Sequence, residues 1–442
     1  MSTPNTSLEL SMQAINPADT AWMLVSTALV LLMTPALAFF YGGLVRNKNS
    51  LNTMMMSFVA LGVVGITWAV AAYSLALSEG SPFLGGLANL GLAGVGTEAK
   101  GTIPHVLFMA YQGTFAIITA ALISGAVVER MRFGPYVAFI ALWTLLVYAP
   151  VAHWVWGGGW LMSLGVLDFA GGTVVHINAG VSALVAALVL GARKDYGRQA
   201  LLPHNVPFTL LGAGLLWFGW FGFNGGSALA ANELAGLAFA NTFLAPMATL
   251  VVWTVLDYVR TGRATAVGVA TGIVVGLVAV TPAAGFVSPA GALVLGAVAA
   301  VPSYFVIALR SRTRIDDSLD VFAGHGVGGL TGALLTGVLA QKVWNSAGND
   351  GLLFGNPGQL GLQALGAVSS AVYAAIMTLV ILKALALVMS LRAVPRIEGV
   401  GMDVSQHGEE AYASGEGSIL VPPEIAVAPD PLPAFTPQVA SR

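Results

Sequence analysis

The sequence has no cysteine and little charge. Only 9% of its 442 residues are charged, whereas an ordinary globular chain carries about 25% charged residues. The absence of cysteine excludes disulfides, thiolate metal sites and cysteine nucleophiles, and it leaves the redox compartment undetermined. The formal net charge of −2 contains no basic excess, so the composition gives no indication of nucleic-acid binding.

Apolar side chains take the place of the missing charge. Hydrophobic residues make up 57% of the chain, and the mean hydropathy is +0.82. Because a soluble chain of this composition could not cover its surface with polar groups, we expect an all-α, multi-pass membrane protein. Eleven apolar runs are long enough to span a bilayer, near 20–45, 50–77, 104–128, 134–155, 171–192, 205–229, 235–258, 265–285, 288–309, 320–340 and 360–391.

The positive charges lie almost entirely on one side of these runs. Only Lys100 and Lys342 flank a run on the other side. Fourteen basic residues fall on alternate loops, namely Arg46, Lys48, Arg130, Arg132, Arg193, Lys194, Arg198, Arg260, Arg263, Arg310, Arg312, Arg314, Arg392 and Arg396. Since basic residues favour the cytoplasm, we expect the N-terminus outside and the C-terminus in the cytoplasm, as an odd number of spans requires.

The two ends of the apolar region set the domain boundaries. The first run has no basic residue before it and is too long for a signal peptide, so we expect a retained helix, although "PALA" at 35–38 resembles a cleavage site. The run 360–391 is too long for an upright span, and we expect it to tilt or to project into the cytoplasm. We therefore predict a membrane domain over 1–396 and a cytoplasmic tail over 397–442, disordered after about 413.

Two similar stretches place an acid and a histidine at the start of a span. "DFAGGTVVHINAG" begins at Asp168 and contains His176, and "DVFAGHGVGGLTG" begins at Asp320 and contains His325. A titratable side chain in hydrocarbon is costly, so each is a candidate functional residue. The two stretches begin spans five and ten, which run in opposite directions. This predicts an inverted repeat of spans 1–5 and 6–10, over about 20–192 and 205–340, with sites at the repeat interface.

Glycines accompany both histidines at helical spacing. They are Gly172 and Gly180 around His176, and Gly328, Gly329 and Gly332 after His325. Small residues let two helices approach closely, so the two imidazoles could touch. For either histidine alone, a structural role bonded to backbone is an equal alternative, but the matching positions favour a shared site. Counting along each span places His176 toward the outside and His325 toward the inside, and the sequence alone does not bring them to one depth.

Three aromatic clusters lie where the chain nears the outer face. They are "YQGTF" (111–115), "HWVWGGGW" (153–160) and "WFGFNGGS" (220–227). Such clusters often form a lipid-facing belt. The alternative is a cation site, in which aromatic faces hold a cation and the hydroxyl of Ser227 accepts its hydrogen bond. The histidines at span ends, His105, His153 and His204, are interpreted as structural or interfacial.

Together these residues resemble the ammonium transporter (Amt/Mep/Rh) family, of the Amt branch. The resemblance covers nearly the whole chain and rests on the motifs above and on "FFYGGLVRNKN" (39–49), "YQGTFAIITAALISGAVVERMRF" (111–133), "GWFGFNGGSALAANE" (219–233), "DDSLDVFAGHGVGG" (316–329) and "EGVGMDVSQHGEEAY" (398–412). It implies an ammonium transporter that is not an enzyme and uses no cofactor or metal. It also implies a homotrimer of eleven-helix protomers, each with its own pore.

The resemblance implies roles for residues of the outer vestibule. Trp156 and Ser227 would recruit ammonium, with Tyr111 beside them, and Asp168 would organise this site and assist deprotonation. Many members have Phe where this chain has Tyr111, and we expect recruitment to survive that change. The presence of Trp156 and Ser227 argues against the Rh branch.

The resemblance also implies roles for residues of the pore. Phe115 and Phe223 would stack and close it above the twin histidines His176 and His325. Trp220 would line the pore beside them. Ammonia, or methylammonium as an analogue, would pass this hydrophobic path with a possible proton relay.

Partners and rival functions follow from the same comparison. We expect a plasma-membrane protein, in a bacterial inner membrane, whose tail is regulatory and meets a PII-type signal protein at the cytoplasmic face. One alternative is a sensor of the same fold, against which we note no signalling pattern after residue 412. The other is an intramembrane metalloenzyme using the two histidines, which would need further ligands such as an H-E-x-x-H pattern that neither span offers.

Overall fold

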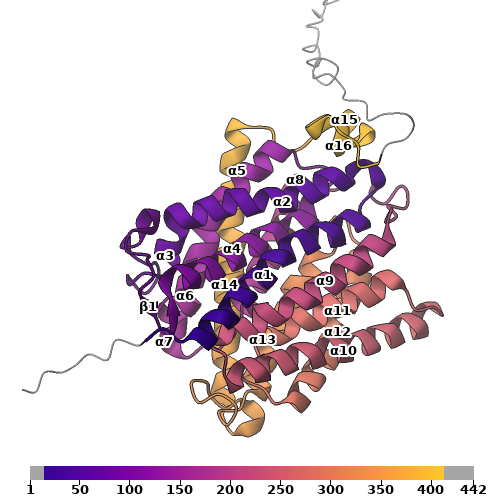
Figure 1. Cartoon of the computed structure of the whole chain (residues 1–442). Helices are drawn as coiled ribbons and strands as arrows, with labels where there is room; N and C mark the ends of the chain where they lie inside the picture. Colours follow the sequence, from indigo (N-terminus) through magenta and orange to yellow (C-terminus); the bar gives the residue numbers. More distant parts are fainter. Residues whose placement is uncertain (1–13, 413–442) are drawn as a thin grey trace, which may run out of the picture.

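The computed structural model describes residues 14–412. The predicted tail beyond residue 412 lies outside the described residues. Ten helical segments of this part are long and apolar enough to cross a membrane. Together they form an all-helical bundle (Figure 1), with α15 (Pro395–Val400) and α16 (Met402–His407) at the end opposite the small hairpin of β1 (Ala99–Lys100) and β2 (Ile103–Pro104).

The remaining helices follow the predicted runs closely. Several are continuous rods that contain a turn of π-helix, marked η. In chain order they are α1 (Pro17–Leu44), α2 (Ser50–Thr67) with η2 (Trp68–Ala72) and α3 (Tyr73–Leu77), α4 (His105–Val127), α5 (Phe133–Trp143) with η4 (Thr144–Tyr148) and α6 (Ala149–Trp156), α7 (Trp160–Leu164), η5 (Gly172–Ile177) with α8 (Asn178–Leu190), α9 (Val206–Gly225), α10 (Glu233–Thr261), α11 (Ala266–Val280), α12 (Pro289–Arg310), η7 (Phe322–Val327) with α13 (Gly328–Leu339), and α14 (Pro357–Val388). Short 3₁₀ turns lie at Asn47–Asn49, Leu90–Leu92, Gly226–Ala228 and Leu352–Phe354.

The predicted eighth span is shorter than expected. Its helix, α11, ends at Val280 after 15 residues, and the buried segment that follows contains Pro282. Pro282 has no backbone N–H to continue the helical hydrogen bonds, and its ring would clash with the preceding turn, which explains the early end. The count of eleven spans, the orientation and the inverted repeat therefore stay predictions, while the multi-pass helical class is confirmed.

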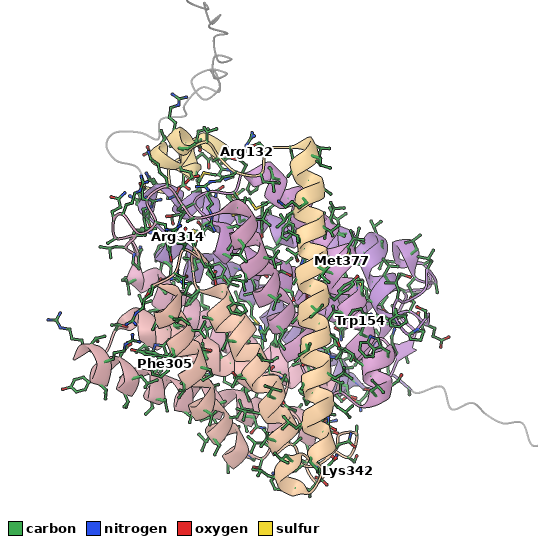
Figure 2. All side chains as sticks on the ribbon, turned by 180° about the vertical axis from the view of Figure 1, so that it is seen from behind. Arg132, Trp154, Phe305, Arg314, Lys342 and Met377 are labelled. Atoms are coloured by element: carbon green, nitrogen blue, oxygen red, sulfur yellow. The ribbon has the colours of Figure 1, made fainter. Side chains whose placement is uncertain are left out.

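The two ends of the bundle differ in charge as predicted. Arg132 and Arg314 lie toward one end and Lys342 at the other (Figure 2), with the 32-residue α14 running along the back of the bundle between them. At the Arg-rich end the buried carboxylate of Glu129 pairs with Arg46 at 3.0 Å and with Arg193 at 2.8 Å. Burial alone would raise the pKa of Glu129, but the two guanidinium groups hold it below its usual value. This cluster ties together loops that follow three different spans.

Glycines let helix α1 pack closely against helix α9. A Cβ at Gly219 would overlap Met33, and one at Gly222 would lie 2.6 Å from the Cβ of Leu29. These glycines let α1 and α9 approach more closely than larger side chains would allow. The "PALA" segment lies inside α1 and is part of this packed core.

Candidate functional site

The two histidines meet in the centre of the bundle. His176 lies in η5 and His325 in η7, and both side chains are buried. Their Nδ1 atoms are 3.2 Å apart, and the rings are stacked with centroids 5.3 Å apart. The two imidazoles are therefore in contact, and a shared functional site stays a prediction. Each histidine sits in a turn of π-helix, a local widening that recurs at functional positions in membrane and soluble proteins.

Glycine contacts explain how two spans reach a common depth. A Cβ added at Gly180 would overlap the backbone nitrogen of Gly326, and one at Gly329 would lie 2.9 Å from the Cβ of His176. The backbones of η5–α8 and η7–α13 thus cross in contact at the level of the histidines. Counting residues along each span did not predict this common depth, because such a count does not include the point at which the two helices cross.

The short contact between the rings constrains their protons. When both imidazoles are neutral, one Nδ1 donates to the other, so one ring carries its proton on Nδ1 and the other on Nε2. The Nε2 of His176 is buried and has no hydrogen-bond partner among the described residues. The pair can therefore hold a shared proton while presenting an unused nitrogen to a small molecule beside it.

Asp168 holds the helix that carries His176. Its carboxylate accepts hydrogen bonds from the backbone N–H groups of Gly171, Gly172, Thr173 and Val174, at 2.6–3.1 Å. These N–H groups belong to the first turn of a helix and have no partner within it, so Asp168 acts as a cap. The indole of Trp156 donates to the backbone carbonyl of Asp168 at 2.9 Å. One residue thus fixes both the histidine helix and an aromatic of the outer cluster.

The counterpart of Asp168 near His325 is Asp317, three residues before the second stretch begins, and the predicted correspondence between Asp168 and Asp320 is wrong. The Asp317 carboxylate accepts from the N–H of Phe322 at 2.7 Å, at the start of η7. Asp320 instead pairs with Arg310 and has a left-handed backbone, φ 57°. Asp168 and Asp317 each stand eight residues before their histidine, and this equal spacing was the signal available in the sequence.

Two phenylalanines close the space on one side of the histidines. The rings of Phe115 and Phe223 are stacked with centroids 4.1 Å apart. The ring of His176 lies 6.1 Å from Phe223 and 5.4 Å from Trp220, centroid to centroid. The Trp220 indole donates to Thr281 at 2.9 Å, which fixes its orientation. The stacked pair and the histidines therefore form one column of rings.

A cavity of about 190 Å³ lies beyond the stacked phenylalanines, and we call it the outer cavity because it is on the side predicted to face outward. Trp156, Phe115 and Ser227, one from each of the three aromatic clusters, line it. Residues that sequence reasoning missed also line it, among them Phe108, Gln112 and Phe169. Phe108, Gln112 and Phe115 recur at helical spacing along α4, which was the available signal.

Two predicted residues stand behind this cavity and do not line it. They are Tyr111 and Asp168. The Tyr111 hydroxyl donates to the carbonyls of Phe223 at 2.9 Å and Gly222 at 3.1 Å, and lies 3.3 Å from the Ser227 hydroxyl. Ser227 also donates to the Phe223 carbonyl, at 2.8 Å, which leaves its lone pairs free to accept.

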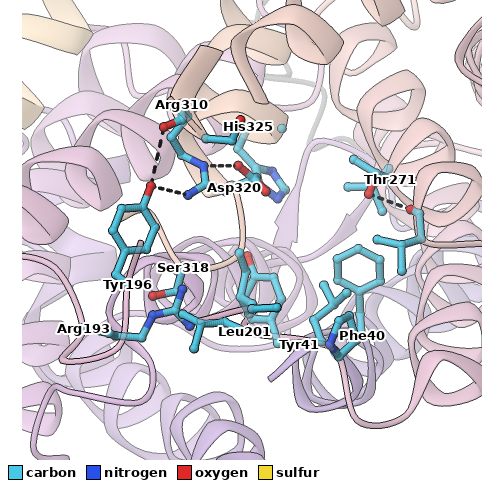
Figure 3. Close-up of a pocket in the computed structure, with 18 of the residues that line it drawn as sticks. Phe40, Tyr41, Arg193, Tyr196, Leu201, Thr271, Arg310, Ser318, Asp320 and His325 are labelled. Atoms are coloured by element: carbon cyan, nitrogen blue, oxygen red, sulfur yellow. Dashed lines mark hydrogen bonds and ion pairs between the residues drawn. The ribbon is translucent and has the colours of Figure 1, made fainter. Parts of the chain in front are cut away.

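Three cavities follow one another through the bundle. Phe223 and both histidines line a narrow apolar space of about 10 Å³, roughly enough for one water molecule. His325 also lines an inner cavity of about 530 Å³. Figure 3 shows this inner cavity, in which the Arg310 guanidinium lies between the Tyr196 hydroxyl and the Asp320 carboxylate. The stacked phenylalanines and the histidine pair are thus the two partitions between the outer and inner cavities.

The three histidines at span ends, His105, His153 and His204, make structural contacts. His153 bonds the carbonyls of Ala76 and Ser81, at 3.0 and 2.8 Å. His204 bonds the carbonyl of Val45 at 2.9 Å. His105 lies between the Glu98 carboxylate and the Tyr73 hydroxyl. None of the three lines any of the three cavities described above.

Comparison with known proteins covers the whole of this site. A family model described as Ammonium Transporter Family matches residues 21–412. An ammonium transporter of Aquifex aeolicus (strain VF5) is 50% identical over 406 residues, which cover 90% of this chain and 94% of that protein. The crystal structure of Saccharomyces cerevisiae Mep2 is similar with a TM-score of 0.79 at 38% identity, covering 84% of this chain and 86% of that chain. A structure described as a sensor Amt protein has a TM-score of 0.82 at 28% identity, covering 88% of this chain and 98% of that chain.

Proposed function

The chain belongs to the ammonium transporter family, and on that basis we propose that it recruits NH₄⁺ in its outer cavity, removes a proton and conducts NH₃ past the twin histidines. The observation that carries this proposal is the succession of cavities. Cation-binding groups line the outermost cavity, apolar rings partition the route, and the narrow space beyond holds two imidazoles. Such a route suits a substrate that enters charged and crosses neutral.

The outer cavity has the chemistry of a cation site. The indole of Trp156 and the ring of Phe115 offer π faces to a desolvated cation. Ser227 contributes an oxygen whose own proton is already donated elsewhere, so it accepts a hydrogen bond from an ammonium N–H. Gln112 adds a side-chain amide oxygen that can also accept a hydrogen bond from ammonium. We assign recruitment to these four side chains.

Selectivity against potassium follows from deprotonation. NH₄⁺ and K⁺ are similar in size, so a pore that only measured size would conduct both. The space between the stacked phenylalanines and the histidines offers a bare cation almost no oxygen ligands, and an ion in an apolar medium is strongly disfavoured. Ammonium can leave its proton behind and cross as NH₃, whereas K⁺ has no proton to lose.

The histidine pair supplies hydrogen bonds along this apolar route. Ammonia can donate to the unused Nε2 of His176 and pass on to His325, whose ring borders the inner cavity. Because the two rings share a proton through their Nδ1 atoms, they can also relay a proton by exchanging tautomers. We propose that the negative charge of Asp168 favours the loss of the ammonium proton. Asp168 lies behind the outer cavity, next to Phe169 in the chain and bonded to Trp156, and both of these residues line that cavity.

Assembly and regulation belong to the same proposal. We propose a homotrimer in a bacterial inner membrane, with the cytoplasmic tail as the point at which a PII-type signal protein acts. The contacts of α15 and α16 support the regulatory role of the tail. Asp403 of α16 accepts the backbone N–H groups of Leu51 and Asn52 at the start of α2, at 3.0 and 2.7 Å. A tail bound to the start of a span can transmit its displacement to that span.

A sensor is the second candidate, because a structural neighbour is described as a sensor Amt protein. The two functions differ in flux. A transporter sustains ammonium uptake, whereas a sensor binds ammonium and carries little of it.

The test is the response of purified protein in proteoliposomes to pulses of ammonium and of K⁺, with Trp156→Leu as the variant. We expect sustained ammonium flux and no K⁺ current from the parent protein. Trp156→Leu should raise the half-saturating ammonium concentration, since it removes a cation–π face that contributes about 0.5–2 kcal/mol. Ammonium binding without flux would favour the sensor, and an unchanged half-saturating concentration in Trp156→Leu would remove this tryptophan from recruitment.

A further inference from the structure

A lysine of the outer hairpin stands against the wall of the outer cavity. Lys100 ends β1, and the turn at Gly101, with φ 64°, returns the chain to Ile103 of β2. The Lys100 nitrogen lies 4.7 Å from the ring centroid of Phe108, which lines the outer cavity. A cation within about 6 Å of an aromatic ring is attracted to its face. Lys100 itself does not line the cavity, so the hairpin places an alkylammonium group next to it, over a ring that the substrate would meet.

A chain of hydrogen bonds holds this lysine in place. The Lys100 nitrogen donates to the hydroxyl of Tyr73 at 3.2 Å, and that hydroxyl lies 2.5 Å from Nε2 of His105. The Nδ1 of His105 lies 2.8 Å from the Glu98 carboxylate. With the proton of a neutral His105 on Nδ1, every donor in this chain faces an acceptor. The lysine is thus positioned by its neighbours and is not a free surface side chain.

The charge of Lys100 has no direct counterion. Among residues 14–412, no carboxylate lies within 4.0 Å of its nitrogen, and the half-exposed Glu98 bonds to His105 instead. Burial alone lowers the pKa of Lys100, without a charged partner to oppose it. A positive charge that is partly buried and unpaired acts on its surroundings more strongly than a solvated one, because less water screens it.

We propose that Lys100 determines the ammonium affinity of the outer cavity, as a tethered alkylammonium that occupies the face of Phe108 and repels further cations. This inference rests on the proposed recruitment function of that cavity. Lys100 belongs to the same chemical class as methylammonium and already interacts with the Phe108 ring, and its charge repels a cation on the cavity side of that ring. The cavity then fills at higher ammonium concentrations than its aromatic lining alone would set.

The test compares Lys100→Gln, which keeps a hydrogen-bond donor for Tyr73, with Lys100→Arg, which also keeps the charge. The readout is the ammonium-pulse current of the full protein in proteoliposomes over a range of ammonium concentrations, at low and high ionic strength. At low ionic strength Lys100→Gln should lower the half-saturating ammonium concentration about two- to tenfold, the range expected for removal of one nearby like charge. The maximum current should not change. The difference in half-saturating concentration between Lys100→Gln and the parent should decrease at high ionic strength, because salt screens the charge. Lys100→Arg should match the parent.

An unchanged or raised half-saturating concentration in Lys100→Gln would overturn the proposal and leave Lys100 a structural part of the hairpin. Should Lys100→Gln yield no current, Lys100→Met is read in the same way, since it preserves the length of the side chain without charge. Trp156→Leu in the same series separates the two proposals. If Trp156→Leu shifts the affinity and Lys100→Gln does not, only the lysine proposal fails. If neither Trp156→Leu nor Lys100→Gln changes the half-saturating concentration, the proposed recruitment by the outer cavity fails as well.

Discussion

At the scale of single residues, the site combines side chains that face the cavities with side chains that hold them. Trp156, Ser227 and Phe115 face the outer cavity, whereas Tyr111 stands behind it and donates to the carbonyl of Phe223. The sequence indicated the aromatic clusters, and the family resemblance supplied Phe115 and Phe223. Neither of them separated the residues that line the cavity from those that support it, because that distinction depends on how α4 is rotated about its axis.

Tyr111→Phe tests this division of roles. It removes one buried hydroxyl and keeps the ring, which lies 5.0 Å from that of Phe115, centroid to centroid. We expect the maximum ammonium current to persist and the free energy of unfolding to fall by about 1 kcal/mol, the usual net contribution of a hydrogen bond. Tyr111→Ala, which also removes the ring, serves as the disruptive control. Loss of current in Tyr111→Phe would mean that the hydroxyl contacts the substrate directly.

The acids illustrate what a local motif can and cannot show. Asp168 and Asp320 share a similar following sequence, yet Asp317 is the residue that caps the second histidine helix. Sequence similarity gave weight to the residues after the acid, whereas capping depends on the distance from the acid to the helix start. The eight-residue spacing to each histidine is the better guide to that role.

At the scale of helices, glycine contacts decide where the rods cross. The sequence predicted close approach of the two histidine helices, because small residues recur along both. It could not predict their common depth, since a crossing point depends on the tilt of both helices within the bundle. The early end of α11 is another feature of this kind, because apolar composition continues beyond Val280 although the helix does not.

Gly180→Ala tests the crossing. The added methyl group would overlap the backbone at Gly326, and backbone cannot move aside as a flexible side chain can. We expect a loss of stability of about 1–3 kcal/mol or more, with a lower thermal unfolding midpoint and reduced ammonium current. Gly214→Ala is the matched control, because a Cβ there has no neighbour within 4 Å. Equal behaviour of the two variants would contradict a crossing that requires glycine.

At the scale of the whole molecule, the C-terminal helices α15 and α16 are bound to the rest of the bundle through specific polar contacts. Glu398 pairs with Arg392 at 2.6 Å, and the backbone N–H of Met402 donates to Asn49 at 2.8 Å. Asn49 also donates to Glu129 of the buried ion cluster, at 2.9 Å. The family resemblance predicted a regulatory tail, but the sequence did not show that it reaches the start of α2.

Truncation after Arg396 tests the regulatory role of the tail. The truncated protein should remain folded, because the helical bundle keeps its core, while its ammonium flux changes or its inhibition by a PII-type protein is lost. A chain that ends after Tyr412 is the control, since it retains all the contacts described for α15 and α16. A truncated protein that transports and is inhibited like the full chain would remove the tail from regulation.

The central claim is that the histidine pair excludes K⁺ by admitting only a substrate that gives up a proton. The most direct measurement compares K⁺ and ammonium currents of His176→Asp in proteoliposomes with those of the parent protein. A carboxylate at this position supplies a fixed charged acceptor within the apolar space, which can draw in water and let a cation pass with its charge. The account predicts that His176→Asp keeps ammonium flux and conducts K⁺, whereas the parent conducts no K⁺. A His176→Asp protein that carries ammonium and still rejects K⁺ completely would contradict it.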